Sequence, residues 1–259
     1  MQIADRVFIV TGASSGIGAA VGRALAEGGG RVALVARRVE RLEELAGQLG
    51  PSSLAIPIDL TTAEAPEHVH AATLEAFGAV HGLVNCAGRG LAGDLLELDL
   101  DSLDEALELN LVAPLRLIQR VAPRLVEQEE GVIVNVSSPT ARMGLPGIAG
   151  YAISKSALDA LTAALRRELF GTGVRVIAVY PGVTESEFYQ HIMGEDDGDG
   201  ARPPGRPASA VAAAIVRGIL RNQREVWTLS GAERNRLRLM TMMGRVAPTA
   251  LDRGLSPRR

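Results

Sequence analysis

Short runs of apolar, mostly β-branched residues recur along the chain and alternate with longer stretches of mixed polarity. The apolar runs are residues 7–10, 32–36, 54–58, 83–86, 132–136, 174–179 and 226–229. Runs of this kind are typical of strands buried on both faces of a sheet. The stretches with helical spacing are 17–27, 40–49, 63–77, 103–127 and 152–170. This alternation predicts an α/β fold, doubly wound around a parallel sheet of about seven strands, with helices on both faces.

Two segments depart from this rhythm. Residues 185–207 are polar and rich in Gly, Asp and Pro, and a long loop of this kind inside a compact domain is usually functional. We therefore predict one catalytic domain over residues 1–259, with 185–207 as a substrate lid and 232–259 as a basic tail. Part of the tail, residues 234–243, mixes Arg with Leu and Met at helical spacing. This pattern favours a packed or oligomeric helix over contact with a membrane surface.

Composition excludes several classes of protein. Of the residues, 47% are hydrophobic, which argues against global disorder, and no run approaches the roughly 18 apolar residues of a membrane span. No secretory signal opens the chain, so we expect a cytoplasmic protein. A formal net charge of −3 gives no reason to expect nucleic acid binding. A single cysteine, Cys86, and four histidines without ligand spacing predict no disulfide and no metal site.

A glycine-rich turn, Thr11–Gly18, lies between the first predicted strand and the first predicted helix. Its glycines at 12, 16 and 18 allow a tight turn and close approach of the backbone to a phosphate. The free N–H groups of a helix N-terminus favour an anion there. The turn therefore favours a nucleotide pyrophosphate site over an ordinary glycine loop.

Tyr151 and Lys155 are four residues apart, so on a helix they share one face. Lys155 is also the only lysine among the 27 Lys and Arg residues. An ammonium beside a tyrosine lowers the pKa of the phenol, which suits it to proton transfer with a carbonyl or alcohol. Ser138, at the end of a predicted strand, could hold the substrate oxygen. The structural alternatives are an interfacial tyrosine, a solvated lysine and a turn serine.

Together these motifs resemble the short-chain dehydrogenase/reductase family, over the chain up to about Ser186. The resemblance rests on Thr11–Gly18, Asn85–Gly88, Asn110, Ser138 thirteen residues before Tyr151, Tyr151–Lys155 and Pro181–Gly182. It implies a Rossmann-type NAD(P)-binding domain in which the catalytic residues are Asn110, Ser138, Tyr151 and Lys155. It implies cofactor contacts from Gly12, Ser14, Ser15, Gly16, Ile17, Gly18, Arg37, Arg38, Asp59, Leu60, Asn85, Ala87, Gly88, Tyr151, Lys155, Pro181, Gly182, Thr184 and Ser186. It also implies a homodimer or homotetramer.

For several of these residues, a purely structural role is an alternative to the role that the resemblance implies. By the resemblance, Asn110 holds a water that links Lys155 to solvent. Pro114 supports this, because proline has no N–H for the carbonyl of Asn110, although the helix could instead begin near Pro114. Asp59 could be a helix cap and Leu60 part of the core. The hydroxyl groups of residues 184 and 186 could bind the nicotinamide carboxamide or only stabilise a turn.

The end of the second predicted strand bears on the choice of cofactor. Ala36 stands where NAD-dependent relatives carry an acid, and Arg37 and Arg38 follow it. Arginine suits a 2′-phosphate, so NADP(H) is favoured over NAD(H). We thus expect an NADP(H)-dependent oxidoreductase that interconverts a carbonyl and a secondary alcohol on a small molecule. A non-catalytic NADP-binding sensor is the alternative. A sugar-nucleotide epimerase type is less consistent, because its glycine turn is usually Gly-x-x-Gly-x-x-Gly.

Overall fold

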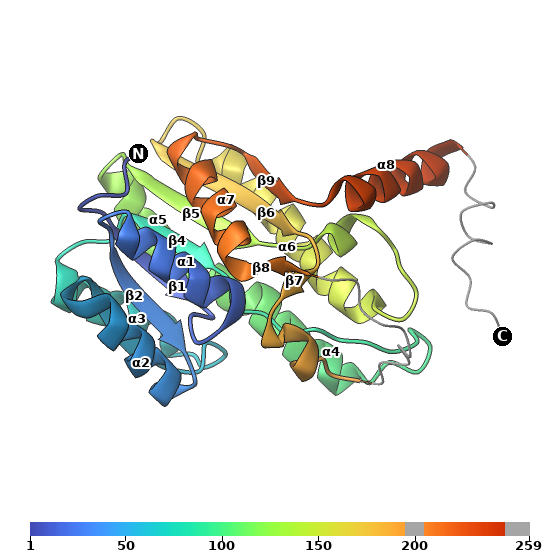
Figure 1. Cartoon of the computed structure of the whole chain (residues 1–259), viewed down its shortest axis with the longest axis horizontal. Coiled ribbons are helices and arrows are strands. Elements are labelled where there is room, and N and C mark those ends of the chain that lie inside the picture. The colour runs from blue at the N-terminus through green and yellow to red at the C-terminus, as the bar shows by residue number, and fades with distance from the viewer. Residues whose placement is uncertain (195–204, 247–259) are drawn as a thin grey trace.

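The computed structural model describes residues 1–194 and 205–246. A seven-stranded, all-parallel sheet crosses this part of the chain in the order β3-β2-β1-β4-β5-β6-β9 (Figure 1). Its strands are β1 Val7–Thr11, β2 Arg31–Ala36, β3 Ser53–Pro57, β4 Gly82–Asn85, β5 Gly131–Val136, β6 Val174–Pro181 and β9 Glu225–Thr228. The predicted doubly wound α/β fold is confirmed, and the ends of each predicted strand lie within two residues of those of an observed strand.

Helices cover both faces of the sheet and enclose two separate cores. The helices are α1 Gly16–Glu27, α2 Val39–Leu49, α3 Ala65–Phe77, α4 Leu100–Leu107, α5 Ala113–Glu127, α6 Ala149–Glu168, α7 Ala208–Leu220 and α8 Gly231–Val246. Side chains of α1, α2 and α7 share one core with Phe8 and Val10 of β1. Ile9, between them, belongs to the other core, with residues of α3 and α5. Successive side chains of a strand point to opposite faces, so a fully apolar strand serves both cores.

A widened helical turn separates α4 from α5. The sequence predicts one helix over 103–127, and the chain is helical from Leu100 to Glu127 but passes through a π-helical turn, η2 Glu108–Val112. The N–H of Ala113 donates to the carbonyl of Glu108, five residues back. Pro114 follows and has no N–H to give to Asn110, so the ordinary ladder is interrupted at that point. α5 does begin beside Pro114, at Ala113, but it continues the π-helical turn before it rather than starting from a loop.

The segment predicted as a lid contains short regular elements. β7 Thr184–Glu185 pairs in parallel with β8 Arg206–Pro207, and η4 Glu187–His191 is a short 3₁₀ helix between them. Residues 195–204 of the predicted lid lie outside the described residues. Sequence patterns missed α7, whose alanines carry little periodic signal.

The tail contains α8, so the expected helix at 234–243 is present, while residues 247–259 lie outside the described part. Figure 1 shows α8 leading away from the sheet beyond β9. Glu233 ties its first turn to the body, because its carboxylate accepts from the N–H groups of Val183 and Ser230. No helix in the described ranges is long and apolar enough to cross a membrane.

Candidate active site

A cavity of about 680 Å³ lies where the sheet strands end and brings together most of the predicted site residues. Its predicted lining residues are Gly12, Ser14, Ser15, Gly16, Ile17, Gly18, Arg37, Arg38, Asp59, Leu60, Ala87, Gly88, Ser138, Tyr151, Lys155, Pro181, Gly182, Thr184 and Ser186. Asn85 and Asn110 are the two predicted site residues that do not line it. Ligands of open parallel sheets bind at this edge, because the loops that follow the strands converge there.

The glycine turn has a backbone that other residues could not adopt. Gly12 has φ +67°, and a β-carbon there would lie 2.9 Å from the backbone nitrogen of Ala87. A β-carbon on Gly18 would collide with the carbonyl oxygen of Gly12. α1 starts at Gly16, with no acidic residue in its first turn and no side-chain cap from Ser15. Its first N–H groups therefore remain available to an anion at the cavity wall, and the turn fits a pyrophosphate.

Ser138 and Tyr151 meet at the other end of the cavity. Ser138 follows β5, and Tyr151 lies near the start of α6. The Ser138 hydroxyl accepts from the Thr140 hydroxyl at 2.8 Å and from the Thr140 N–H at 3.2 Å. Both lone pairs of the Ser138 hydroxyl are thus engaged, and its proton remains available to Tyr151 or to a substrate oxygen. The two hydroxyl groups face the same part of the cavity, so one carbonyl oxygen can contact both.

Lys155 is 4% exposed and lies one helical turn beyond Tyr151. Its Nζ donates to the carbonyl of Val136 at 3.0 Å and lies 5.9 Å from the centroid of the Tyr151 ring. Burial lowers the pKa of Lys155 to about 8, although Cys86 and Asp159 oppose the shift. The lysine is therefore charged at neutral pH and close to losing that charge above it.

The predicted lowering of the Tyr151 pKa is wrong in sign for this arrangement. Burial raises the pKa of Tyr151 well above its ordinary value, and the hydrogen bond with Ser138 only partly opposes the rise. Removing a phenolate from water is costly, and the Lys155 ammonium is engaged with the Val136 carbonyl rather than with the phenol oxygen. Tyr151 is consequently a neutral hydroxyl at pH 7, which is the form that can donate a proton.

Asn85 and Asn110 are buried behind the cavity wall. Asn85 Nδ2 donates to Asn135 Oδ1 at 2.8 Å, inside the sheet, and the cofactor contact of Asn85 stays a prediction. Asn110 Oδ1 accepts from the N–H of Arg89, and its Nδ2 donates to the Arg89 carbonyl and to the Ser154 hydroxyl. Asn110 thereby fixes the loop after β4 to α6. A water between Asn110 and Lys155 stays a prediction.

Gly88 lies between the buried amide and the lysine. A β-carbon on Gly88 would be 3.0 Å from Asn110 Oδ1 and 3.3 Å from Lys155 Nζ. Both groups therefore face the same point of the loop that follows β4. The absence of a side chain at this position lets the loop pass between α6 and the π-helical turn.

At the glycine end of the cavity the two predicted arginines have different partners. Arg38 donates to the Ser14 hydroxyl at 3.1 Å and to the Ser15 hydroxyl at 2.6 Å. Arg37 is 61% exposed and forms a longer ion pair, 3.7 Å, with Asp59. The Asp59 carboxylate also accepts from the N–H and hydroxyl of Thr61, as a turn or cap residue does. These bonds and the nearby Arg37 hold the pKa of Asp59 below its usual value, against the effect of burial.

The strand β6 leads into a turn that carries the hydroxyl groups of Thr184 and Ser186, for which the sequence allowed either carboxamide binding or turn stabilisation. The Thr184 hydroxyl donates to the carbonyl of Gly182 at 2.8 Å, so its turn role is present. Ser186 lies against the glycine turn, where a β-carbon on Gly16 would be 3.1 Å from Ser186 Cβ. The segment after β6 thus reaches across the cavity to α1.

Three neighbours of the site were missed by sequence reasoning. Phe188 lies 5.5 Å from Tyr151 between ring centroids, and Thr140 orders Ser138 as described above. Glu187 forms ion pairs with Arg38 and Arg41. Glu187 and Phe188 fall in the segment predicted only as a polar loop, whose sequence gives no sign of what it contacts. Proximity to Ser138 is the only signal that could have singled out Thr140.

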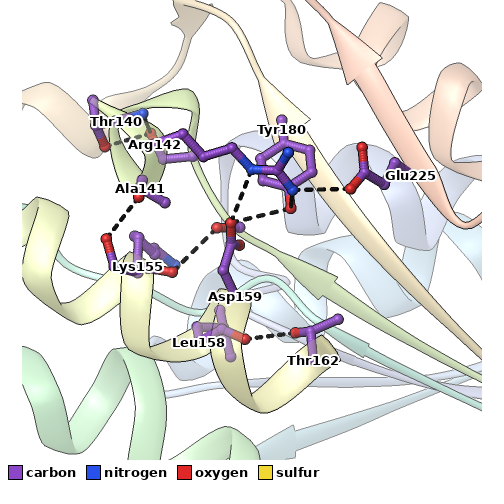
Figure 2. Close-up of polar contacts among 12 residues, drawn as sticks. Thr140, Ala141, Arg142, Lys155, Leu158, Asp159, Thr162, Tyr180 and Glu225 are labelled. Carbon is purple, nitrogen blue, oxygen red and sulfur yellow. Dashed lines mark hydrogen bonds and ion pairs between the residues drawn. The ribbon is translucent and has the colours of Figure 1, made fainter. Parts of the chain in front are cut away.

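A cluster of charged and aromatic side chains fixes the segment that follows Ser138 (Figure 2). Arg142 ends a 3₁₀ turn, η3 Pro139–Arg142, and donates to the Tyr180 hydroxyl at 2.5 Å and to Glu225 at 2.9 Å. Its guanidinium lies 4.6 Å from the centroid of the Tyr180 ring and pairs with Asp159 of α6 at 3.5 Å. Arg142 therefore joins the Ser138 segment to the helix that carries Tyr151 and to strands β6 and β9.

No group of three or more His, Cys, Asp or Glu side chains in the described ranges is arranged to hold a metal ion. Burial raises the pKa of the single cysteine, Cys86, to about 12, so this thiol is not a nucleophile at neutral pH.

Comparison with known proteins gives a consistent family. A model of the family described as short chain dehydrogenase matches residues 6–196. An uncharacterized oxidoreductase of Staphylococcus saprophyticus is 33% identical over 219 residues, which cover 83% of this chain and 92% of that protein.

Two solved structures are similar along their whole length. A short-chain dehydrogenase/reductase of Burkholderia phymatum in complex with NAD has a TM-score of 0.87 at 22% identity, over 95% of this chain and 96% of that chain. At that identity the likeness shows the fold alone. A short-chain dehydrogenase of Burkholderia cenocepacia in complex with NADP has a TM-score of 0.80 at 28% identity, over 99% and 100%. The family match and the shared architecture agree with the site geometry: the chain belongs to the short-chain dehydrogenase/reductase family of oxidoreductases.

Proposed function

We propose that this protein is an NADP(H)-dependent oxidoreductase that interconverts a carbonyl and a secondary alcohol on a small molecule, with Tyr151 as the proton donor and acceptor. The observation that carries the proposal is one cavity with a glycine turn and arginines at one end and the Ser138–Tyr151 pair beside Lys155 at the other. When bound, the nicotinamide supplies or accepts a hydride.

The chain's own residues would act on the substrate oxygen. In the reducing direction, Ser138 donates a hydrogen bond to the carbonyl oxygen and orients it toward Tyr151. Tyr151 gives its proton to that oxygen as negative charge develops there. The Lys155 ammonium, 5.9 Å from the centroid of the Tyr151 ring, would stabilise the phenolate that remains by charge attraction, which is stronger at a buried position than in water. In the oxidising direction the same groups take the proton from the alcohol.

The choice of NADP(H) rests on the arginines at the end of β2. A guanidinium binds a phosphate through charge-assisted, often paired hydrogen bonds. Arg38 is oriented by its bonds to Ser14 and Ser15, and Arg37 lines the same cavity. The Burkholderia cenocepacia structure in complex with NADP supports this choice.

The test is NADPH oxidation with a panel of ketones and acyl carbonyls, followed by variants. Tyr151→Phe removes one oxygen, so we expect kcat to fall by about a hundredfold or more, with little change in NADPH affinity. Near-normal turnover of Tyr151→Phe would contradict the assignment. NADPH binding without turnover of any substrate would favour the non-catalytic sensor.

Cofactor preference is tested separately. Arg37→Ala and Arg38→Ala should each weaken NADPH more than NADH, and the difference should shrink at high salt, because the lost contact is between charges. Equal weakening of both cofactors by both variants would exclude the arginines as selectors of the 2′-phosphate.

A further inference from the structure

The protein already holds an anion beside its glycine turn. Glu187, the first residue of η4, pairs with two arginines from another part of the chain. Its Oε2 lies 2.7 Å from Arg38 Nη1, and its Oε1 lies 2.5 Å from Arg41 Nη1. Each carboxylate oxygen thus has its own guanidinium. These bonds lower the pKa of Glu187 to about 2, so the carboxylate is ionised at any working pH.

The Glu187 carboxylate lies at the edge of the glycine turn, beside the residues expected to bind the cofactor. Arg38, which binds Glu187 through one Nη, binds the Ser14 and Ser15 hydroxyl groups through its other two nitrogens. All three nitrogens of the guanidinium are therefore used at the edge of the glycine turn. Arg41 lies one helical turn further along α2, and Glu187 lines the same cavity as Arg38. The carboxylate thus occupies the region to which the proposed function assigns the 2′-phosphate of NADP(H).

A carboxylate and a phosphate make the same demands on a guanidinium. Both accept paired, charge-assisted hydrogen bonds, but a phosphate dianion carries more charge and a third oxygen. The two anions would also repel each other if both lay beside the same two arginines. A cofactor without the phosphate leaves the Glu187 pairs intact, whereas one with the phosphate brings a dianion to guanidinium groups that the carboxylate already neutralises.

We propose that Glu187 is a specificity-determining residue, an internal competitor that holds Arg38 and Arg41 until a 2′-phosphate displaces it. The inference rests on the proposed function, because it assumes that the 2′-phosphate site is at Arg38. Glu187 reduces the difference in affinity between NADP(H) and NAD(H). It weakens the binding of NADP(H), whose 2′-phosphate has to replace it, and it keeps the arginines neutralised when NAD(H) binds. Removal of the charge at residue 187 therefore increases the preference for NADP(H).

The experiment measures the binding of two adenosine ligands to the full-length protein by calorimetry at low salt. The ligands are adenosine 2′,5′-bisphosphate and ADP. For Glu187→Gln we expect the affinity for the 2′,5′-bisphosphate to rise about fivefold or more, about 1 kcal/mol, while that for ADP changes less than about twofold. Glu185→Gln, two residues away and on the same segment, is the charge-matched control and should change neither affinity. Equal changes for both ligands, or a loss of 2′,5′-bisphosphate affinity, would overturn the inference.

A second comparison separates this inference from the proposed function. In an Arg38→Gln background the gain from Glu187→Gln should disappear, because the shared guanidinium is gone. A wild-type protein that prefers ADP would contradict the proposed cofactor, yet a selective gain in Glu187→Gln would still support the competitor. A wild-type protein that prefers the 2′,5′-bisphosphate, with no selective gain in Glu187→Gln, would overturn the competitor alone.

Discussion

Lys155 should make the folded protein less stable at neutral pH than at alkaline pH. Its pKa is 10.5 as a free side chain and about 8 in the fold. One pKa unit corresponds to about 1.4 kcal/mol, so holding the ammonium in this buried position costs about 3 kcal/mol at pH 7. The sign follows from proton binding: between the two pKa values the unfolded chain binds more protons than the folded one. Stability therefore rises with pH from about 8 to 10.5.

Lys155→Met removes the charge and keeps a side chain of similar length. The absolute change in stability also contains the lost hydrogen bond to the Val136 carbonyl, which is worth about 1–3 kcal/mol in the opposite direction. That contribution is nearly the same at every pH and cancels when two pH values are compared. Between pH 7 and pH 9.5, the free energy of unfolding of the wild type should increase by about 2 kcal/mol relative to that of Lys155→Met.

Urea unfolding, followed through the fluorescence of Trp227, measures both proteins at the two pH values. Trp227 is the only tryptophan and stacks on Tyr180 at 4.0 Å, so its environment changes on unfolding. The variant should also lose carbonyl reduction. Parallel stability curves, with a constant difference between wild type and variant from pH 7 to pH 9.5, would refute the claim that burial depresses the Lys155 pKa.

Three further outcomes are expected. Turnover in carbonyl reduction should fall as pH rises through about 8, because Lys155 loses the charge that stabilises the phenolate; a rate that is flat from pH 7 to pH 9.5 would contradict this. Gly18→Ala should destabilise the protein by more than about 1 kcal/mol in thermal unfolding, since its β-carbon meets the Gly12 backbone, whereas exposed Gly47→Ala in α2 should stabilise it by about 0.5–1 kcal/mol. Arg142→Gln should lower kcat about tenfold with NADPH affinity unchanged, because the segment that carries Ser138, the proposed substrate-orienting residue, loses its anchor. Loss of affinity without loss of kcat would exclude this role of Arg142.

The sheet and the glycine turn were predictable because their signals are local. A strand buried on both faces is mostly apolar, so β1, β2 and β5 are visible as nearly continuous apolar runs. Gly12 and Gly18 occupy positions where a β-carbon meets backbone atoms, so no other residue satisfies the turn. The burial of a strand and the steric need for glycine both act on a few consecutive residues, so each restricts the residue types found there.

The pKa of Tyr151 and the ion pairs of Glu187 could not be predicted from the sequence. The Tyr151 pKa was expected to fall because a lysine lies four residues away, but helical spacing does not give the degree of burial or the partner of the ammonium. The Glu187 contact joins residues 149 positions apart in the chain. Only the fold brings the segment after β6 onto the start of α2, so no pattern in either segment announces the pair.

Pro114 and Asn110 show where local reasoning stops. Pro114 correctly indicates an irregular helix, since a missing N–H affects the ladder wherever the chain goes next. The use of the irregularity depends on Arg89 and Ser154. They come from a different loop and a different helix, and they occupy both donors and one acceptor site of the Asn110 side chain. The Asn110 side chain therefore holds the loop at Arg89 and Gly88 in place, and this loop packs against Lys155. Both N–H groups of the side-chain amide are committed to holding the site together, so a proton path through Asn110 would have to use its main-chain carbonyl or the remaining lone pair of Oδ1.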